Sequence, residues 1–382
     1  MMDTLLFKEM LSVDSTSGRE RALADFLVDR FQTDGNKVER FDVVSMAGDV
    51  PEGSGIPQNL LFSWGKPKVV FCTHLDTVPP FIAPEFDDDG KVRGRGTCDA
   101  KGQIFAMWEA CKALADRGYD GFGLLLLAGE ETGSYGAKAF REQHPGAEWV
   151  IVGEPTDNCM ASAAKGTKSF EVTFTGKAFH SGYPQFGVSA VELFNDFVNA
   201  LRSIRFPLDE TLGETTWNIG RLSSDNPQNI LSDKLTCRVY FRTTFESDEM
   251  VCNIMKNIAG KDAKLRFGRP RVQDGSDVVA KDVAPWQKAM SVQAFGGDSP
   301  SRFDVMDGFE AKPVAFGSDA PQLTDFPHKI LCGPGSILVA HRDDEHILLK
   351  DIETAVDNYI NIFETIRSTT LKNWVNIRST TK

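Results

Sequence analysis

A histidine and an aspartate lie two residues apart where an apolar stretch of the chain ends. Residues 69–72 read Val-Val-Phe-Cys and lead into His74-Leu75-Asp76. Alternate side chains of an extended strand point the same way, so His74 and Asp76 are expected to share a face. A carboxylate that holds one imidazole nitrogen fixes its tautomer and leaves the other nitrogen available to a metal ion. The triplet alone is a weak indication, because a structural or exposed histidine would look the same.

Other acidic residues and one more histidine follow apolar runs in the same way. Asp99 lies in the glycine-rich turn 94–102, Glu130 and Glu131 follow residues 124–129, Glu154 follows residues 149–153, and His341 follows residues 337–340. In open α/β sheets, ligands bind beyond the carboxyl ends of the strands. These side chains are therefore expected to converge although they are far apart in the sequence.

Composition narrows the classes of protein. A length of 382 residues suggests two domains, because single cores seldom grow past about 250–300 residues. The net charge of −12 argues against nucleic acid or an anionic membrane as the main partner. The chain shows neither the run of about 20 apolar residues that spans a bilayer nor a signal peptide at its start. Seven cysteines without paired spacing fit a reducing compartment, so a cytoplasmic protein is predicted.

A larger domain is predicted from helices and strands that alternate in the first third of the chain. Helices are expected at residues 19–31, with Ser17 as the N-cap, and at 103–117, where apolar side chains recur at i, i+3 and i+4. Strands are expected at 59–62, 68–73, 124–129 and 149–153. Apolar strands alternating with helices indicate an α/β fold whose mostly parallel sheet is sandwiched by helices.

A smaller domain is predicted at residues 166–272. Its expected strands are 168–176, 217–222, 235–243 and 264–268, and its expected helices are 188–204 and 248–259. This β-α-β-β-α-β order is that of a ferredoxin-like α+β domain. The metal-binding catalytic domain is then discontinuous and comprises residues 1–165 and 273–382. Its second part is expected to contain a helix at 286–295, strands at 314–317 and 330–332, and a closing helix at 348–366.

Taken together, five segments resemble the dinuclear zinc hydrolase family of acetylornithine deacetylase, succinyl-diaminopimelate desuccinylase, aminoacylase and glutamate carboxypeptidase, and most of all its acetylornithine deacetylase members. The segments are residues 74–79 (HLDTVP), 94–102 (GRGTCDAKG), 129–131 (GEE), 153–155 (GEP) and 340–341 (AH). The resemblance spans nearly the whole chain. It implies that His74 and Glu154 bind one metal ion, that Glu131 and His341 bind a second, and that Asp99 bridges them. It also implies a cis peptide bond after Asp99.

The residue types agree with this implied centre. Two histidines and three carboxylates without cysteine suit two divalent ions, of which zinc fits best and cobalt or manganese are alternatives. Two such ions can lower the pKa of a bound water toward about 7. Glu130, beside the ligand Glu131, is then expected to act as general base and later to protonate the leaving amine, while Asp76 orients His74. Adjacent carboxylates at a strand end could otherwise simply be solvated.

The resemblance also implies roles for residues outside the metal set. His180, in the turn 177–182, would stabilise the oxyanion in a partner subunit's site, which predicts a homodimer through the inserted domain; an exposed turn histidine is the alternative. Asn229 and Arg242 resemble a substrate-binding signature, although Ser232 stands where the family has proline. Arg242 could grip an α-carboxylate with two parallel hydrogen bonds. Two residues of the loop 317–320, Ser318 and Asp319, match a substrate-side loop.

The expected activity is hydrolysis of the amide bond of a small N-acyl amino acid by a two-zinc amidohydrolase. An N-acetylornithine-type deacetylase of arginine biosynthesis is the leading expectation, although relatives often carry a tryptophan where this chain has residues 80–85 (PFIAPE). An N-succinyl amino acid desuccinylase and a metallo-exopeptidase for dipeptides are alternatives. A non-catalytic binding protein is a further one. The presence of Glu130 and of all five candidate ligands argues against it.

Overall fold

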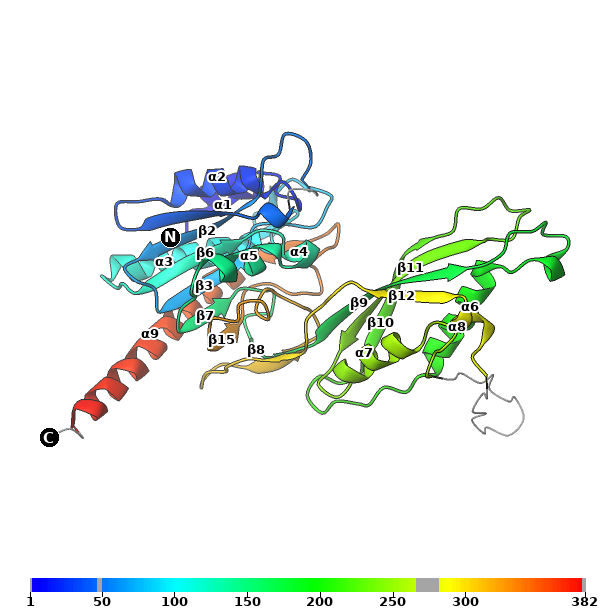
Figure 1. The fold of residues 1–382 in the computed structure, drawn as a ribbon. Coiled ribbons are helices and arrows are strands. Elements are labelled where there is room, and N and C mark those ends of the chain that lie inside the picture. Colours follow the sequence, from blue (N-terminus) through cyan, green and yellow to red (C-terminus); the bar gives the residue numbers. More distant parts are fainter. Residues whose placement is uncertain (1, 47–49, 266–281, 380–382) are drawn as a thin grey trace. The chain divides into compact units, whose positions relative to one another are not determined.

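The computed structural model describes residues 2–46, 50–265 and 282–379 and divides into two compact units (Figure 1). The first unit comprises Met1–Ser162, Arg302–Lys312 and Ser318–Lys382. The second comprises Ala163–Ser301 and Pro313–Gly317. Within the described ranges, none of the helices combines the length and apolar character that crossing a membrane requires.

The first unit is built on a six-stranded sheet with the strand order β1-β2-β6-β3-β7-β15 (Figure 1). Its strands are β1 (Lys37–Asp42), β2 (Gln58–Trp64), β3 (Val69–His74), β6 (Phe122–Leu127), β7 (Trp149–Val152) and β15 (His328–Leu331). The four strands β6, β3, β7 and β15 are parallel, and β1 and β2 join them in antiparallel pairing. Every residue of β3 and β6 is buried, so both faces are covered, as predicted for a mostly parallel sheet.

Four helices share one apolar core with this sheet: α1 (Thr4–Leu11), α2 (Glu20–Phe31), α3 (Lys101–Asp116) and α9 (Leu349–Ser379). Aromatic side chains fill much of the core. The ring of Phe31 stacks on Trp108 with 3.9 Å between centroids, and Phe7 stacks on Phe105 with 4.7 Å. Helix α5 (Tyr135–Gln143) packs against a separate small cluster around Met46. This packing holds the parallel strands in place, and their carboxyl ends carry candidate site residues.

Short elements complete the first unit: a 3-10 turn at Val44–Met46, β4 (Glu85–Phe86), β5 (Lys91–Arg93), α4 (Glu130–Gly133) and β16 (His346–Leu348). The strands β4, β5 and β16 form an antiparallel sheet of their own. The strands β8 (Met160–Ala164), β13 (Ser301–Arg302) and β14 (Ala311–Val314) form another three-stranded sheet.

The second unit has an antiparallel sheet with the order β10-β11-β9-β12. Its elements are β9 (Gly166–Thr175), a 3-10 turn at Pro184–Phe186, α6 (Ala190–Ser203), β10 (Thr216–Ser223), β11 (Lys234–Thr243), α7 (Asp248–Asn257), α8 (Pro285–Lys288) and β12 (Met290–Ala294). Alternate residues of β9, Phe170, Val172 and Phe174, enter a core with both longer helices. The ferredoxin-like order of elements is therefore present.

Three of the predicted elements differ from the structure. The strand expected at 314–317 is wrong, because β14 comprises Ala311–Val314 and ends where that strand was expected to begin. The helix expected at 286–295 is wrong: only Pro285–Lys288 is helical, and Met290–Ala294 forms β12, which pairs with β9. This strand, rather than the one expected at 264–268, completes the insert sheet; residues 266–268 lie outside the described ranges, as does the predicted boundary at 272. Because β12 pairs with β9, the second unit extends to Ser301.

Candidate metal centre

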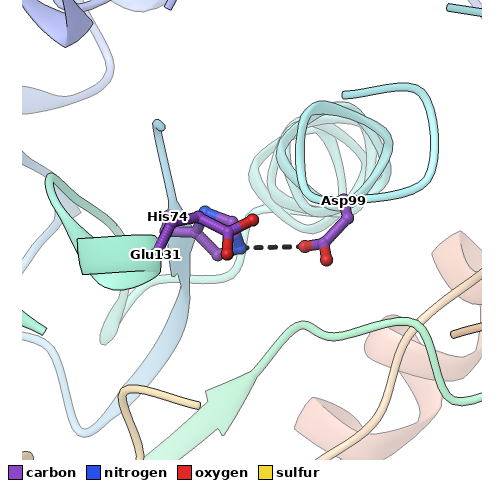
Figure 2. Close-up of side chains that lie close together, drawn as sticks. All are labelled: His74, Asp99 and Glu131. Carbon is purple, nitrogen blue, oxygen red and sulfur yellow. Dashed lines mark hydrogen bonds and ion pairs between the residues drawn. The ribbon is translucent and has the colours of Figure 1, made fainter. Parts of the chain in front are cut away.

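The carboxyl end of β3 delivers His74 to the candidate centre. Its side chain is 1% exposed, and Nε2 lies 3.0 Å from Oδ1 of Asp99 (Figure 2). On the other side of the ring, Nδ1 lies 2.9 Å from the backbone oxygen of Asp76 and 3.4 Å from Oδ1 of the same residue. The predicted carboxylate is thus present, but the carbonyl of Asp76 is the closer partner. Either acceptor favours a proton on Nδ1 and directs Nε2 inward.

Asp99 lies between two imidazoles. Its Oδ1 faces His74, and its Oδ2 lies 3.4 Å from Nε2 of His341. The same Nε2 of His341 is 2.8 Å from Oε1 of Glu131. The two oxygens of one carboxylate thus lie near two different histidines, which is the arrangement that a bridging ligand needs. The peptide bond between Asp99 and Ala100 is cis, which confirms the expectation from the family resemblance.

The buried carboxylate of Asp76 holds the segment that carries both glutamates. Its Oδ1 accepts a hydrogen bond from the backbone N–H of Glu130 at 3.0 Å, and its Oδ2 accepts one from that of Glu131 at 3.1 Å. The hydroxyl of Ser17 donates to Oδ2 at 2.9 Å. The prediction of Ser17 as a helix cap is therefore wrong, since α2 begins after Arg19 without a side-chain cap.

A tight turn places Glu130 and Glu131 in this position. Gly129, between β6 and α4, has a φ of +71°, and a Cβ there would lie 2.6 Å from the sulfur of Met46. The left-handed φ favours glycine, and any larger side chain would also have to displace the thioether of Met46. The turn follows the carboxyl end of β6, which pairs with β3, so the glutamates emerge beside His74.

The carboxylates around both histidines raise the pKa of their imidazoles. Burial lowers the pKa of His74, but its hydrogen bonds with Asp76 and Asp99 outweigh this and raise the pKa well above its usual range. Hydrogen bonds with Asp99 and Glu131 raise the pKa of His341 to about 10. Burial acts against the charge of Asp99, yet hydrogen bonds from the two imidazoles hold its pKa well below the usual range.

The remaining carboxyl groups are shifted the other way. Burial raises the pKa of Glu130 and of Glu154 well above the usual range, the positive charge of His74 opposes it, and the charge of Asp319 adds to it. Burial also raises the pKa of Glu131, against its hydrogen bond with His341. Several buried carboxyl groups close together repel one another when ionised, so the site favours the binding of a cation.

His341 reaches the centre from an exposed segment, contrary to expectation. Its side chain is 49% exposed and its φ is +63°. Residues 337–340 form turns rather than a buried strand, and Leu338 is 77% exposed. The apolar composition of this stretch therefore predicted the position of the histidine correctly, but for the wrong structural reason.

The structure brings the other predicted residues into two groups. Glu154 is buried, follows β7 and interacts electrostatically with His74 and Asp99, although it lies outside the closest set of ligand atoms. Ser318 and Asp319 are buried in the first unit. Three predicted residues, His180, Asn229 and Arg242, belong to the second unit, and their roles stay predictions.

Comparisons with known proteins decide the family. The family model described as peptidase family M20/M25/M40 matches residues 70–365. The chain belongs to peptidase family M20/M25/M40. A probable carboxypeptidase of Aspergillus terreus is 31% identical over 94% of this chain and 84% of its own length. The broad resemblance inferred from the motifs is thereby confirmed, and the chain is an enzyme of the M20 hydrolase family.

Solved structures share the fold of this M20 protein. A tripeptidase from Staphylococcus aureus superimposes with a TM-score of 0.72 at 19% identity, covering 94% of this chain and 96% of that chain. An M20 family metallo-carboxypeptidase from Sulfolobus solfataricus gives 0.69 at 16% identity, covering 94% and 98%. At these identities the likeness establishes the two-unit α/β architecture.

The donor set of the M20 protein fits divalent cations. Ligand atoms of His74, Asp99 and Glu131 lie within 4.8 Å of one another (Figure 2). Imidazole nitrogen and carboxylate oxygen are the ligands of zinc, cobalt and manganese sites. The hydrogen bonds that now join imidazoles to carboxylates occupy the same lone pairs and directions that a cation between them would use. The residues present therefore suit the metal ions that the family implies.

Two residues beside the centre were missed. Arg95 and Glu345 form a fully buried ion pair, and Glu345 accepts a hydrogen bond from the backbone N–H of Asp99 at 3.1 Å. In the sequence, Glu345 ends the acidic run that begins at Asp343 and looks like a solvated surface group. Nothing in the local sequence distinguishes it from such a group, because residues 341–344 form turns and a bend rather than a helix.

Proposed function

We propose that this M20 family protein is a metal-dependent exopeptidase that releases the C-terminal residue from short peptides. The observation that carries the proposal is the contact series from His74 through Asp99 and His341 to Glu131, with Glu130 beside it. The similar Aspergillus terreus protein is a probable carboxypeptidase, which supports this assignment. This favours the exopeptidase alternative over the N-acetylornithine deacetylase that the sequence motifs placed first.

The ligand assignment follows the contacts. His74 and Glu154 would hold one divalent ion, Glu131 and His341 the other, and Asp99 would contact both through its two oxygens. When bound, such ions polarise a carbonyl and make water a stronger nucleophile at neutral pH. Zinc is the proposed metal, with cobalt and manganese as alternatives.

Glu130 handles the proton in this proposal. Its carboxylate takes a proton from the attacking water and returns it to the nitrogen of the departing amino acid. Burial raises the pKa of Glu130, and a carboxylate whose conjugate acid has a higher pKa is a stronger base. The hydrogen bond from its backbone N–H to Asp76 fixes the position of the backbone that carries this side chain.

The carboxylate of the substrate is assigned to Arg242 and Asn229. Arg242 is the penultimate residue of β11, and its guanidinium lies 5.1 Å from the ring centroid of Tyr240. A guanidinium can hold a carboxylate with two parallel hydrogen bonds. A free C-terminal carboxylate occurs in dipeptides, longer peptides and N-acyl amino acids, so this residue selects the end of the substrate rather than its acyl side.

A substrate panel tests the proposal. Protein loaded with zinc, cobalt or manganese is incubated with N-blocked dipeptides, free dipeptides, N-acetylornithine and N-succinyl amino acids, and the released amine is measured. We expect cleavage of peptides that have a free C-terminal carboxylate, and no cleavage by the Glu130→Gln variant. Turnover confined to N-acetylornithine would overturn the exopeptidase assignment in favour of a deacetylase.

We further propose a homodimer through the second unit. Exposed apolar side chains surround His180 in sequence and across its bridge to Ile230: Phe179, Tyr183, Phe186, Val188 and Ile230. Contiguous exposed apolar groups mark interaction surfaces. Mixing His180→Ala with Glu130→Ala protein should restore part of the activity if His180 serves the partner's site. Sedimentation as a monomer at micromolar concentration would contradict the dimer.

The predicted cytoplasmic location is tested by cell fractionation.

A further inference from the structure

Glu345 is buried beside the turn that carries Asp99. Its Oε1 accepts three backbone hydrogen bonds, from the N–H groups of Gly96 at 2.9 Å, Cys98 at 3.1 Å and Asp99 at 3.1 Å. Successive N–H groups that converge on one oxygen form an anion-binding concavity. Here the anion is a side chain supplied from the segment that carries His341.

Arg95 extends this contact to another segment. Its Nη1 pairs with Oε2 of Glu345 and also donates to the carbonyl of Arg342 at 3.1 Å, while its Nε donates to the carbonyl of Pro80 at 3.3 Å. Pro80 follows the segment that begins with His74, and Arg342 is the next residue after His341. One ion pair thus touches three segments, each of which carries candidate ligands or leads away from one.

The strand pair β5 and β16 aligns these segments. His346 is the register partner of Arg93, and the N–H of Gly94 donates to the carbonyl of Glu345 at 3.0 Å. Beyond this ladder the two segments separate, one leading to Asp99 and the other back to His341. The Glu345 side chain joins them where they separate, because it accepts a hydrogen bond from the backbone N–H of Asp99.

We propose that Glu345 and Arg95 are a positioning pair that sets the distance between the carboxylate of Asp99 and the imidazole of His341. Neither residue contacts the imidazoles, so the pair acts through the backbone at Asp99 and beside His341. The inference rests on the proposed two-metal function. According to this inference, the pair raises the affinity for metal, specifically at the position between Asp99, Glu131 and His341.

Replacement of Glu345 by glutamine tests this. The amide keeps one acceptor oxygen but turns an N–H₂ group toward Arg95 or toward the backbone donors. Metal-free protein is titrated with Co²⁺, following heat and the visible absorption of the bound ion. We expect wild-type protein to bind two ions per chain and Glu345→Gln to bind at least one of them about 10–100-fold more weakly, with an altered absorption spectrum.

Glu109→Gln is the matched control. Glu109 lies on α3 in the same unit, its side chain is 11% exposed, and it pairs with Lys112 of the same helix at 2.6 Å. Its Co²⁺ affinity should stay within about twofold of wild type. Equal weakening in both variants, or unchanged Co²⁺ affinity and spectrum in Glu345→Gln, would overturn the inference.

A second variant covers failure of Glu345→Gln to fold, judged by circular dichroism of the metal-free protein. Arg95→Lys keeps the charge opposite Glu345 but cannot also reach both carbonyls, so about tenfold weaker Co²⁺ binding is expected. Unchanged binding by Arg95→Lys would then refute the positioning role. Wild-type protein that binds no Co²⁺ would instead refute the proposed function, so the two failures are distinguishable.

Discussion

Replacement of Asp76 by asparagine should separate metal binding from folding more cleanly than any change to a ligand. The carboxylate accepts hydrogen bonds from the backbone N–H groups of Glu130 and Glu131 on different oxygens. An amide offers only one oxygen, so one of these donors must face an N–H₂ group. At least one hydrogen bond to a charged acceptor is lost, worth about 1.5–3 kcal/mol. About 1.4 kcal/mol corresponds to a factor of ten in an equilibrium constant. If this free energy is lost from metal binding, the metal affinity falls roughly 10- to 150-fold.

That loss should appear as weaker metal binding, because the displaced backbone carries the candidate ligand Glu131. Co²⁺ titration of metal-free Asp76→Asn protein is therefore expected to show an affinity reduced about 10–100-fold, with peptide hydrolysis reduced in parallel at limiting metal. Ser17→Ala is the control, because it removes only the hydroxyl donor to the same carboxylate. It should lower the free energy of unfolding by about 1.5–3 kcal/mol, because this bond too has a charged acceptor, and leave Co²⁺ affinity nearly unchanged.

Two results would refute this reasoning. Asp76→Asn protein that binds Co²⁺ as tightly as wild type would show that the backbone of Glu131 does not depend on Asp76. Ser17→Ala protein that loses as much affinity as Asp76→Asn would show that general loosening of the region, rather than the backbone contacts, sets metal binding.

Three further predictions concern the centre and its support. Glu130→Gln should keep its metal content by elemental analysis while kcat for peptide hydrolysis falls by about 10²–10⁴-fold; loss of metal would contradict its role as base. In metal-free protein the raised pKa of His341 stabilises the fold fully below pH 6.5, and this contribution is lost as the pH rises through about 10. Since ligation needs neutral imidazole, Co²⁺ affinity should rise over that window, and a flat affinity would contradict the assignment. Gly136→Ala should destabilise the protein to urea by about 1–3 kcal/mol, because its Cβ would lie 2.4 Å from the carbonyl oxygen of Ala128; Gly220→Ala, with open space around its Cβ, is the control.

The convergence of candidate ligands that follow strands was predictable because strand ends obey a simple rule. His74 and the pair Glu130 and Glu131 lie where apolar runs end, and the parallel pairing of β3 with β6 brings them together. The order of elements in the insert was predictable for a similar reason, since β9 and β11 alternate buried and exposed side chains. Patterns of period two and changes in apolar content report directly on burial.

Residues whose role depends on one distant contact were not predictable. Ser17 resembles a helix cap in any local reading, and only the approach of Asp76 makes it a donor to that carboxylate. Glu345 resembles a solvated charge until β5 and β16 pair. The helix expected at 286–295 failed because pairing with β9 outweighed local propensity, which is a weak preference.

The two histidines differ in exposure, and in the proposed two-metal centre this difference should determine how quickly each position exchanges its ion. His74 is 1% exposed and His341 is 49% exposed. An ion beside His74 can leave only when a strand end opens, whereas one beside His341 can be reached by a chelator from solvent. Dialysis against a weak chelator should therefore first yield a species that has lost the ion beside His341 and keeps the one beside His74.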